Sequence, residues 1–284
     1  MSTIQTNIPM TIGFVGLGDQ GAPIARAISE AGYELHVWAR RPQSLEALTG
    51  VKYQAYDTVS EMAAASDLVG LCLTEDSDIR HVALDGGLLA NMKPGSVLVN
   101  HGTGLPAFAA ELTAIASAYQ VDVIDAPVSG GHPAAVAKQL LTMVGGEHKV
   151  AERCRPVFET FSKKVAYMGL AGSGQMAKLI NNALLMMNQK NIEDILQFGE
   201  HVGLAIPALV DVLCAGTARS YALEALGTAI TTEKAPHLQK LQLIDMDLFA
   251  EAVALAGHEA EAITRYAVAG ATGLTAVAQL VDVK

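Results

Sequence analysis

The sequence predicts an α/β fold, with an N-terminal domain built on a mostly parallel sheet and an all-α C-terminal domain. Short apolar runs alternate with helical segments as far as Met168, which is the pattern of a chain that crosses repeatedly over a parallel sheet. From Gln175 onward strand patterns almost vanish, and Ala-rich helical segments replace them. We therefore expect two domains, residues 1–168 and residues 169–284.

The first apolar run, residues 12–15, ends in a turn of the form G-x-G-x-x-G, formed by Gly16, Leu17, Gly18, Asp19, Gln20 and Gly21. This spacing is typical of the first strand-to-helix turn of a Rossmann domain, which binds a dinucleotide pyrophosphate. We expect Gly16 to permit the tight turn, Gly18 to let backbone approach the phosphates and Gly21 to allow close helix packing. The alternative is a glycine-rich turn without a ligand, since the chain has 26 glycines.

The residues after this turn complete a strand-turn-helix-strand unit. Residues 22–31 are helix formers closed by Gly32, and residues 33–39 alternate polar and apolar side chains. An NAD site usually has a carboxylate at the end of this second strand, but here Arg40 and Arg41 follow. Two guanidiniums suit a 2′-phosphate, so the sequence predicts NADP as the cofactor. The alternative is a pair of solvated arginines.

Further elements continue the alternation. Thr58 and Glu61 have the spacing of a capping box that opens a helix. We expect later strands at residues 67–73, 96–99, 121–126, 140–144 and 164–168. A hinge-like segment, residues 169–174, then precedes a helix over residues 175–202 of about 40 Å.

Composition narrows the class of protein. The chain has 284 residues, 51% of them hydrophobic, which is enough to bury two cores. No apolar run reaches the roughly 18 residues of a membrane span, and the N-terminus lacks the pattern of a secretory signal. Three scattered cysteines favour a reducing cytoplasm. A net charge of −10 disfavours nucleic acid, and the histidines form no metal-binding motif.

Three segments beyond the glycine turn are candidates for chemistry. Residues 125–131 follow an expected strand, and Ser129 with the N–H groups of Gly130 and Gly131 could hold a carboxylate; the alternative is an ordinary turn. Lys178 and Asn182 lie one helical turn apart, so the lysine could transfer a proton while the amide orients substrate; the alternative is a solvated lysine.

The third segment is residues 100–103, after another expected strand. His101 could donate a proton, but we favour a surface role for it, as for His132 and Arg219. Thr103 is expected at both cofactor and substrate, and Leu73 and Thr74 at the cofactor.

Together, residues 13–18, 125–131 and 172–182 resemble the β-hydroxyacid dehydrogenase family, which includes 3-hydroxyisobutyrate and tartronate semialdehyde reductases. The resemblance implies a Rossmann domain, a helical C-terminal domain, an active site between them, and homodimers or homotetramers. It also implies Lys178 as the catalytic acid/base, Asn182 as a substrate-positioning residue, and a carboxylate site at Ser129, Gly130 and Gly131.

Two departures from the family pattern stand out. Gly102 replaces a serine that contacts substrate, which predicts a roomier pocket with one donor fewer. Met246 replaces the lysine of a Lys-Asp-Leu motif, and Lys240 lies too far along the chain to be assumed a substitute.

The leading hypothesis is an NADP-dependent enzyme that interconverts a β-hydroxy acid and its aldehyde or keto acid. One alternative is reduction of an imine or a bulky carbonyl, because Gly102 would open space. Another is a non-catalytic NADP-binding protein.

Overall fold

The computed structural model describes residues 10–257 and 260–281. The chain divides into two compact units, Met1–Lys178 and Leu179–Lys284. This division falls within a long helix, a little after the boundary that the sequence predicts. The two units are described separately below.

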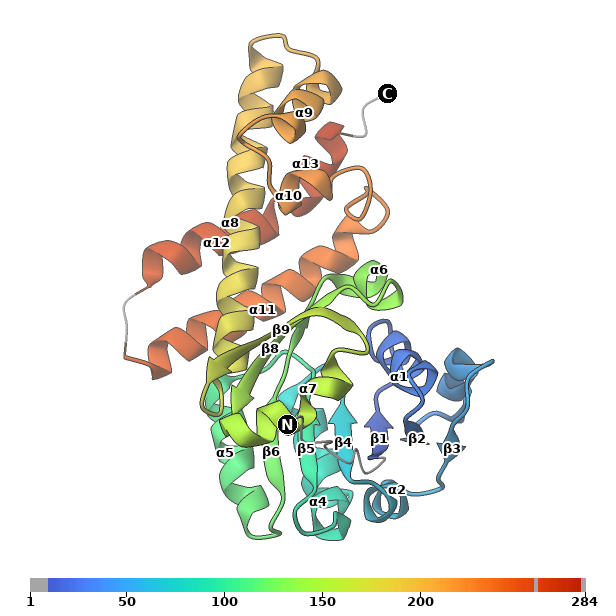
Figure 1. Cartoon of the computed structure of the whole chain (residues 1–284). Helices are drawn as coiled ribbons and strands as arrows, with labels where there is room; N and C mark the ends of the chain where they lie inside the picture. Colours follow the sequence, from blue (N-terminus) through green and yellow to red (C-terminus); the bar gives the residue numbers. More distant parts are fainter. Residues whose placement is uncertain (1–9, 258–259, 282–284) are drawn as a thin grey trace, which may run out of the picture. The chain divides into compact units, whose positions relative to one another are not determined.

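The first unit is built on one sheet whose strand order is β3-β2-β1-β4-β5-β6-β8-β7, with β9 beside β8 (Figure 1). Six strands run parallel and form the Rossmann half of the sheet: β1 (Thr11–Val15), β2 (Glu34–Trp38), β3 (Gln54–Ala55), β4 (Leu68–Leu71), β5 (Val97–Asn100) and β6 (Asp122–Asp125). The order reverses between β1 and β4, which is where such sheets bind ligands.

Alternate side chains of these strands enter two separate cores. Ile12 and Phe14 of β1 belong to one core, while Val15 belongs to the other. In β5, Val99 and Leu98 divide in the same way. Because side chains alternate across a strand, the continuous apolar runs reflect burial on both faces of the sheet.

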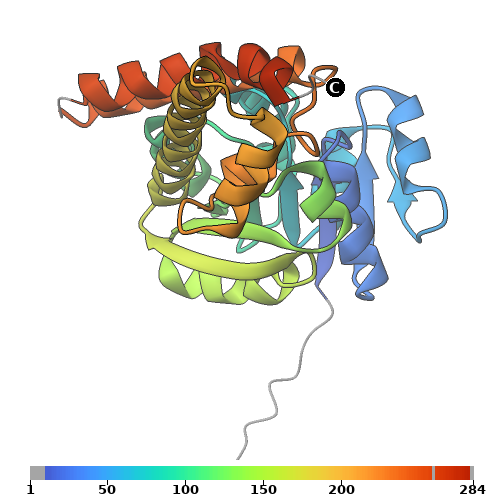
Figure 2. The same ribbon diagram turned by 90° about the horizontal axis from the view of Figure 1, so that it is seen from above.

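Helices cover both faces. The core that holds Phe14 is closed by α1 (Gly21–Glu30), α6 (Gly131–Val136) and α7 (His148–Phe158) (Figure 2). The opposite core is closed by α2 (Val59–Ala65), α3 (Asp76–Arg80), η2 (His81–Asp85), α4 (Leu88–Asn91) and α5 (Pro106–Ser117). A short helix, η1 (Pro42–Leu48), follows β2.

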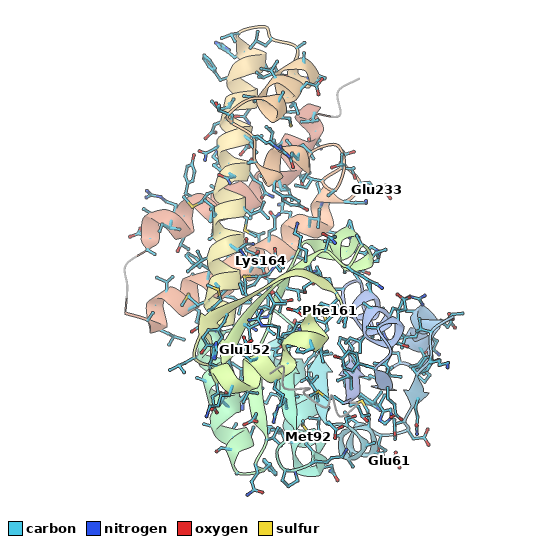
Figure 3. The ribbon with its side chains drawn as sticks, viewed as in Figure 1. Glu61, Met92, Glu152, Phe161, Lys164 and Glu233 are labelled. Carbon is cyan, nitrogen blue, oxygen red and sulfur yellow. The ribbon has the colours of Figure 1, made fainter. Side chains whose placement is uncertain are left out.

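Local sequence signals explain two helix ends. Thr58 accepts a hydrogen bond from the Glu61 backbone N–H, and the Glu61 carboxylate accepts one from the Thr58 N–H, which confirms the capping box at α2. Glu61 is labelled in Figure 3. Gly32, one residue beyond the Ala31 C-cap of α1, has a φ of 94°, a left-handed conformation that favours glycine.

The last part of the sheet differs from the prediction in detail. β8 (Leu140–Gly146) runs antiparallel to β6 and to β7 (Val128–Ser129), a strand that the sequence did not predict. β9 (Ser162–Gly169) is longer than the expected strand. The segment between β9 and the following helix is therefore shorter than the expected hinge-like stretch.

Regular structure in the described part of the second unit is helical. The long helix α8 (Ser173–His201) begins in the first unit and continues into the second, and it is followed by α9 (Ile206–Ala215), α10 (Tyr221–Glu224), α11 (Ala235–Leu255), α12 (Glu261–Thr272) and α13 (Leu274–Val281). Small residues allow a close crossing of α12 and α8, since a Cβ on Gly270 would lie 1.8 Å from the Met186 carbonyl oxygen. A mostly parallel Rossmann sheet followed by helices confirms the predicted fold class.

Within residues 10–257 and 260–281, no helix is long and apolar enough to cross a membrane. Across the same residues, no group of three or more His, Cys, Asp or Glu side chains could hold a metal ion.

Candidate active site

The turn after β1 depends on two glycines for its shape. Gly16 has a φ of 95°, and a Cβ there would lie 2.2 Å from the Cys72 carbonyl oxygen. A Cβ on Gly21 would lie 1.8 Å from the Gly16 carbonyl oxygen. Neither position can take a side chain without moving backbone, so these two glycines let the chain turn tightly and let α1 start close against the sheet.

Gly18 in the same turn is different, because a Cβ built on it meets nothing within 4 Å. α1 begins directly after this turn, and N–H groups at a helix start can bind phosphate, although Pro23 has no N–H and the Ala22 N–H already donates to the Gly18 carbonyl at 3.0 Å. The open space at Gly18 and this helix start fit the pyrophosphate of a dinucleotide. Residues that would hold it are Gly16, Leu17, Gly18, Asp19, Gln20 and Gly21.

Arg40 and Arg41 follow β2, and both are exposed. The Arg40 guanidinium lies 3.6 Å from an Asp78 carboxylate oxygen, and its side chain is 76% exposed. An exposed pair at this separation contributes little to stability. The arginine is therefore not committed to the fold.

The ends of β1, β4 and β5 meet through Leu73. A Cβ on Gly16 would lie 3.1 Å from the Leu73 Cδ2 atom, while a Cβ on Gly102 would lie 2.4 Å from the Leu73 carbonyl oxygen. Leu73 and Thr103 are half-buried at these strand ends, and Thr74 is exposed. The structure thus brings the expected cofactor residues after β4 next to the glycine turn.

The prediction that Gly102 leaves a roomier pocket is wrong. The direction that a side chain would take is occupied by the Leu73 carbonyl and, at 3.2 Å, by the Asn100 Oδ1 atom. The Gly102 N–H also donates to Asn100 Oδ1 at 2.8 Å. This glycine is required by close backbone packing, and it opens no space.

The expected surface role of His101 is also wrong. The ring is 3% exposed and lies among Phe14, Phe158 and Phe161, the last of which is labelled in Figure 3. Its Nδ1 atom lies 2.9 Å from the Ala126 carbonyl oxygen. Burial lowers the pKa of His101 to about 4, so the ring is neutral at pH 7 and belongs to the core.

His132 and Arg219 do lie at the surface, as expected. Arg219 pairs with Glu224. The His132 Nδ1 atom lies 2.6 Å from the Asp19 carbonyl oxygen, which joins the start of α6 to the glycine turn. The candidate carboxylate segment that precedes His132 therefore lies beside the candidate pyrophosphate site.

That segment is partly a strand. Ser129 belongs to β7 and pairs with Leu141 of β8, while Gly130 and Gly131 have φ values of 129° and 67°. These left-handed conformations favour glycine at both positions.

A buried clamp holds the start of α8 against the strand ends. The Gln175 side chain is fully buried; its Nε2 donates to the Gly102 carbonyl at 2.8 Å, and its Oε1 accepts from the Gly104 N–H at 2.9 Å. The Asp125 carboxylate accepts from the N–H groups of Gly172 at 2.8 Å and Gln175 at 2.9 Å. Burial raises the pKa of Asp125, and these backbone hydrogen bonds oppose the rise.

The clamp positions the helix that carries Lys178. This lysine is half-buried and lies one turn beyond Gly174 on α8. Sequence reasoning placed Asp125 in a ligand loop and gave Gln175 no role, although both fix the first turn of α8. A polar residue just inside a helix that starts after a glycine-rich turn is the signal that could have identified Gln175.

Asn182 lies one turn further along α8 and is 6% exposed. Its Nδ2 donates to the Asp245 carboxylate of α11 at 2.7 Å, and its Oδ1 accepts from Asn181 Nδ2 at 3.0 Å. Asp245 was not predicted from the sequence, because it lies 63 residues from Asn182 in the chain. Met246 is fully buried.

These features define an NAD(P)-binding oxidoreductase of the Rossmann class, with a candidate proton-transfer residue on the helix that follows the sheet. Sequence comparisons identify the family of both parts of the chain. The profile of the NAD binding domain of 6-phosphogluconate dehydrogenase matches residues 11–169, and that of the NAD-binding domain of NADP-dependent 3-hydroxyisobutyrate dehydrogenase matches residues 172–280. The chain belongs to the β-hydroxyacid dehydrogenase family.

Individual relatives are also named as dehydrogenases. A 2-(hydroxymethyl)glutarate dehydrogenase from Eubacterium barkeri is 31% identical over 215 residues, which cover 75% of this chain and 71% of that protein. An NAD-dependent L-serine dehydrogenase from Pseudomonas aeruginosa is 32% identical over 214 residues, covering 75% and 72%. The structure of Mycobacterium tuberculosis 3-hydroxyisobutyrate dehydrogenase with L-serine matches with a TM-score of 0.81 at 27% identity, covering 96% of this chain and 99% of that one.

Proposed function

We propose that this protein is an NADP(H)-dependent dehydrogenase that interconverts a β-hydroxy acid and the corresponding aldehyde or keto acid. The observation that carries the proposal is the clamp of Asp125 and Gln175, which fixes the helix of Lys178 at the ends of β5 and β6. The glycine turn with its open space at Gly18 lies at the end of β1 in the same sheet.

Lys178 moves the proton in this mechanism. A nicotinamide cofactor held by the glycine turn would supply the hydride acceptor for oxidation of the hydroxyl-bearing carbon and the hydride donor for the reverse reduction. As a neutral amine, Lys178 takes the hydroxyl proton while the carbonyl forms; as an ammonium, it returns that proton to the carbonyl oxygen. The proton and the electron pair thus leave the substrate by separate routes, and Asn182 orients the reacting group.

The substrate class is a hydroxy acid with a carboxylate two carbons from the reacting carbon. Ser129 and the N–H groups of Gly130 and Gly131 would hold that carboxylate, with Thr103 nearby in the substrate and cofactor site. Two relatives are named for 2-(hydroxymethyl)glutarate and L-serine, both of which carry a hydroxymethyl group next to a carboxylate-bearing carbon. This shared chemistry supports the proposal.

NADP is the cofactor we propose, held at its 2′-phosphate by Arg40 and Arg41. The support is that both guanidiniums are exposed after β2 and that no carboxylate stands at residues 39–41; the Asp78 carboxylate, 3.6 Å from Arg40, is an exposed partner that a phosphate would have to displace. The family includes NAD-dependent members, so the choice must be measured directly.

We also propose a homodimer or homotetramer. α8 carries exposed apolar side chains at Ile195 and Phe198, and the exposed Val202 follows directly after the helix ends at His201, so the three recur at helical spacing. An apolar stripe of this kind suits helix packing between subunits. Light scattering after size exclusion should give twice or four times the chain mass.

Steady-state assays of β-hydroxy acids with NADP⁺ and NAD⁺ test the proposed reaction. We expect turnover of at least one such acid, with NADP⁺ preferred. The imine-reductase alternative loses the opening at Gly102 that favoured it, and cyclic imines assayed with NADPH serve as the comparison. Tight NADPH binding without turnover of any acid, aldehyde or imine would instead support the non-catalytic alternative.

A further inference from the structure

The Asn182 side chain has a fixed orientation. An ionised carboxylate can only accept hydrogen bonds, so the Asn182 group that faces the Asp245 carboxylate at 2.7 Å is the Nδ2 amide nitrogen. The Asn182 Oδ1 atom in turn accepts from Asn181. The Asp245 contact therefore sets the orientation of the amide, and the Asn181 contact is compatible with it.

Both amide atoms of Asn182 keep capacity for one more partner. Nδ2 has a second N–H, and Oδ1 has a second lone pair. The hydrogen bond to a carboxylate polarises the amide, which makes Oδ1 a stronger acceptor. Asn182 is therefore prepared to accept a hydrogen bond from the hydroxyl of a substrate.

We propose that Asp245 is a positioning residue for the reaction, which acts by holding the Asn182 amide with its carbonyl oxygen available to the reacting hydroxyl group. The inference rests on the proposed function, because it assigns Asp245 a role only if Asn182 orients substrate. α11 would then contribute a carboxylate at Asp245. The family pattern instead has a lysine one residue later, where this chain has the fully buried Met246.

A double-mutant cycle tests the proposal on the whole protein with NADP⁺ and the best β-hydroxy acid found. Loss of a charge-assisted hydrogen bond predicts that Asp245→Ala lowers kcat by roughly 10- to 100-fold. Asp245→Asn keeps the size and can still accept from Nδ2 as a neutral group, so its loss should be smaller. In an Asn182→Ala background, either change should have no further effect on kcat.

Two measurements separate positioning from a structural role. NADPH affinity and the thermal midpoint should stay within twofold and about 2 °C of the unmodified protein for Asp245→Asn. Asp247→Asn is the matched control, since Asp247 is an exposed aspartate on the same helix, and it should leave kcat unchanged.

The outcomes are distinct. The positioning role would be overturned if the losses in kcat added fully in the double variant. It would also be overturned if both Asp245→Asn and Asp245→Ala left kcat unchanged. Either result would leave the proposed function intact. Absence of turnover by the unmodified protein would overturn the proposed function and this inference together.

Discussion

Two glycines at the same edge of the sheet have opposite surroundings. Gly18, after β1, has open space where a side chain would project, whereas Gly102, after β5, faces the Leu73 carbonyl oxygen at 2.4 Å. The neighbours differ as well, because Asp19 is exposed and His101 is buried among aromatic rings. One loop leaves room for a ligand, and the other is packed by the protein itself.

The comparison teaches that a glycine in a ligand-binding sheet is not by itself a sign of ligand space. At Gly18 a methyl group would enter the volume proposed for a phosphate, so the cost would fall on binding. At Gly102 a methyl group would collide with backbone, so the cost would fall on stability.

The largest expected effect is a loss of protein stability at acid pH, which comes from the buried His101 beside Gly102. Because the pKa of His101 is about 4 in the folded protein and about 6.5 when unfolded, the unfolded chain binds the proton first as pH falls. The free energy of unfolding should not depend on protonation of His101 well above pH 6.5, and it should fall by about 3 kcal/mol as pH falls from 6.5 to 4. Urea titrations across this range measure it. His101→Phe should remove this part of the slope, and His148→Asn, at an exposed histidine, should leave it.

Gly102→Ala should lower the free energy of unfolding by about 1 to 3 kcal/mol, since the neighbouring atom is backbone and cannot rotate away. Activity should fall as well, because the Gly102 carbonyl is bound by Gln175 of the clamp. Denaturant unfolding and kcat report the two effects. An alanine variant as stable as the unmodified protein would show that the Leu73 contact is not tight.

Gly18→Ala, the matched change in the open loop, should leave the free energy of unfolding unchanged or raise it by up to about 1 kcal/mol, through reduced freedom of the unfolded chain. NADPH should bind more weakly, because the methyl group enters the proposed phosphate space. Unaltered NADPH affinity, measured by fluorescence titration, would contradict the assignment of this turn.

Arg40→Ala should change stability least, by less than about 0.5 kcal/mol, since the side chain is largely exposed. Its effect should appear in cofactor choice. Loss of a charge-assisted contact predicts roughly 10- to 100-fold weaker NADPH binding, with NADH binding nearly unchanged. Equal losses for both cofactors would argue against a 2′-phosphate contact.

Much of the fold could be predicted from sequence, because its signals are local. Strands buried on both faces read as apolar runs, and Thr58 with Glu61 marked the start of α2. The antiparallel strand β7 was missed, since two residues are too few to show periodicity. The boundaries of β9 and α8 differ from the expected ones by a few residues.

The site could be predicted less completely, because it depends on directions and on distant partners. Nothing in the letters around Gly102 tells whether its missing side chain would face solvent or the Leu73 carbonyl. The burial of His101 comes from Phe158 and Phe161, more than fifty residues away in the chain. Asp245 meets Asn182 only through the packing of α11.

The central claim is hydride transfer with Lys178 as the acid/base, and kcat of Lys178→Ala tests it most directly. General acid–base catalysis predicts a fall of roughly 10²- to 10⁴-fold in kcat with NADPH affinity retained. Lys164→Ala, at an exposed lysine of β9, is the control and should keep full activity. Full activity in Lys178→Ala would contradict the account.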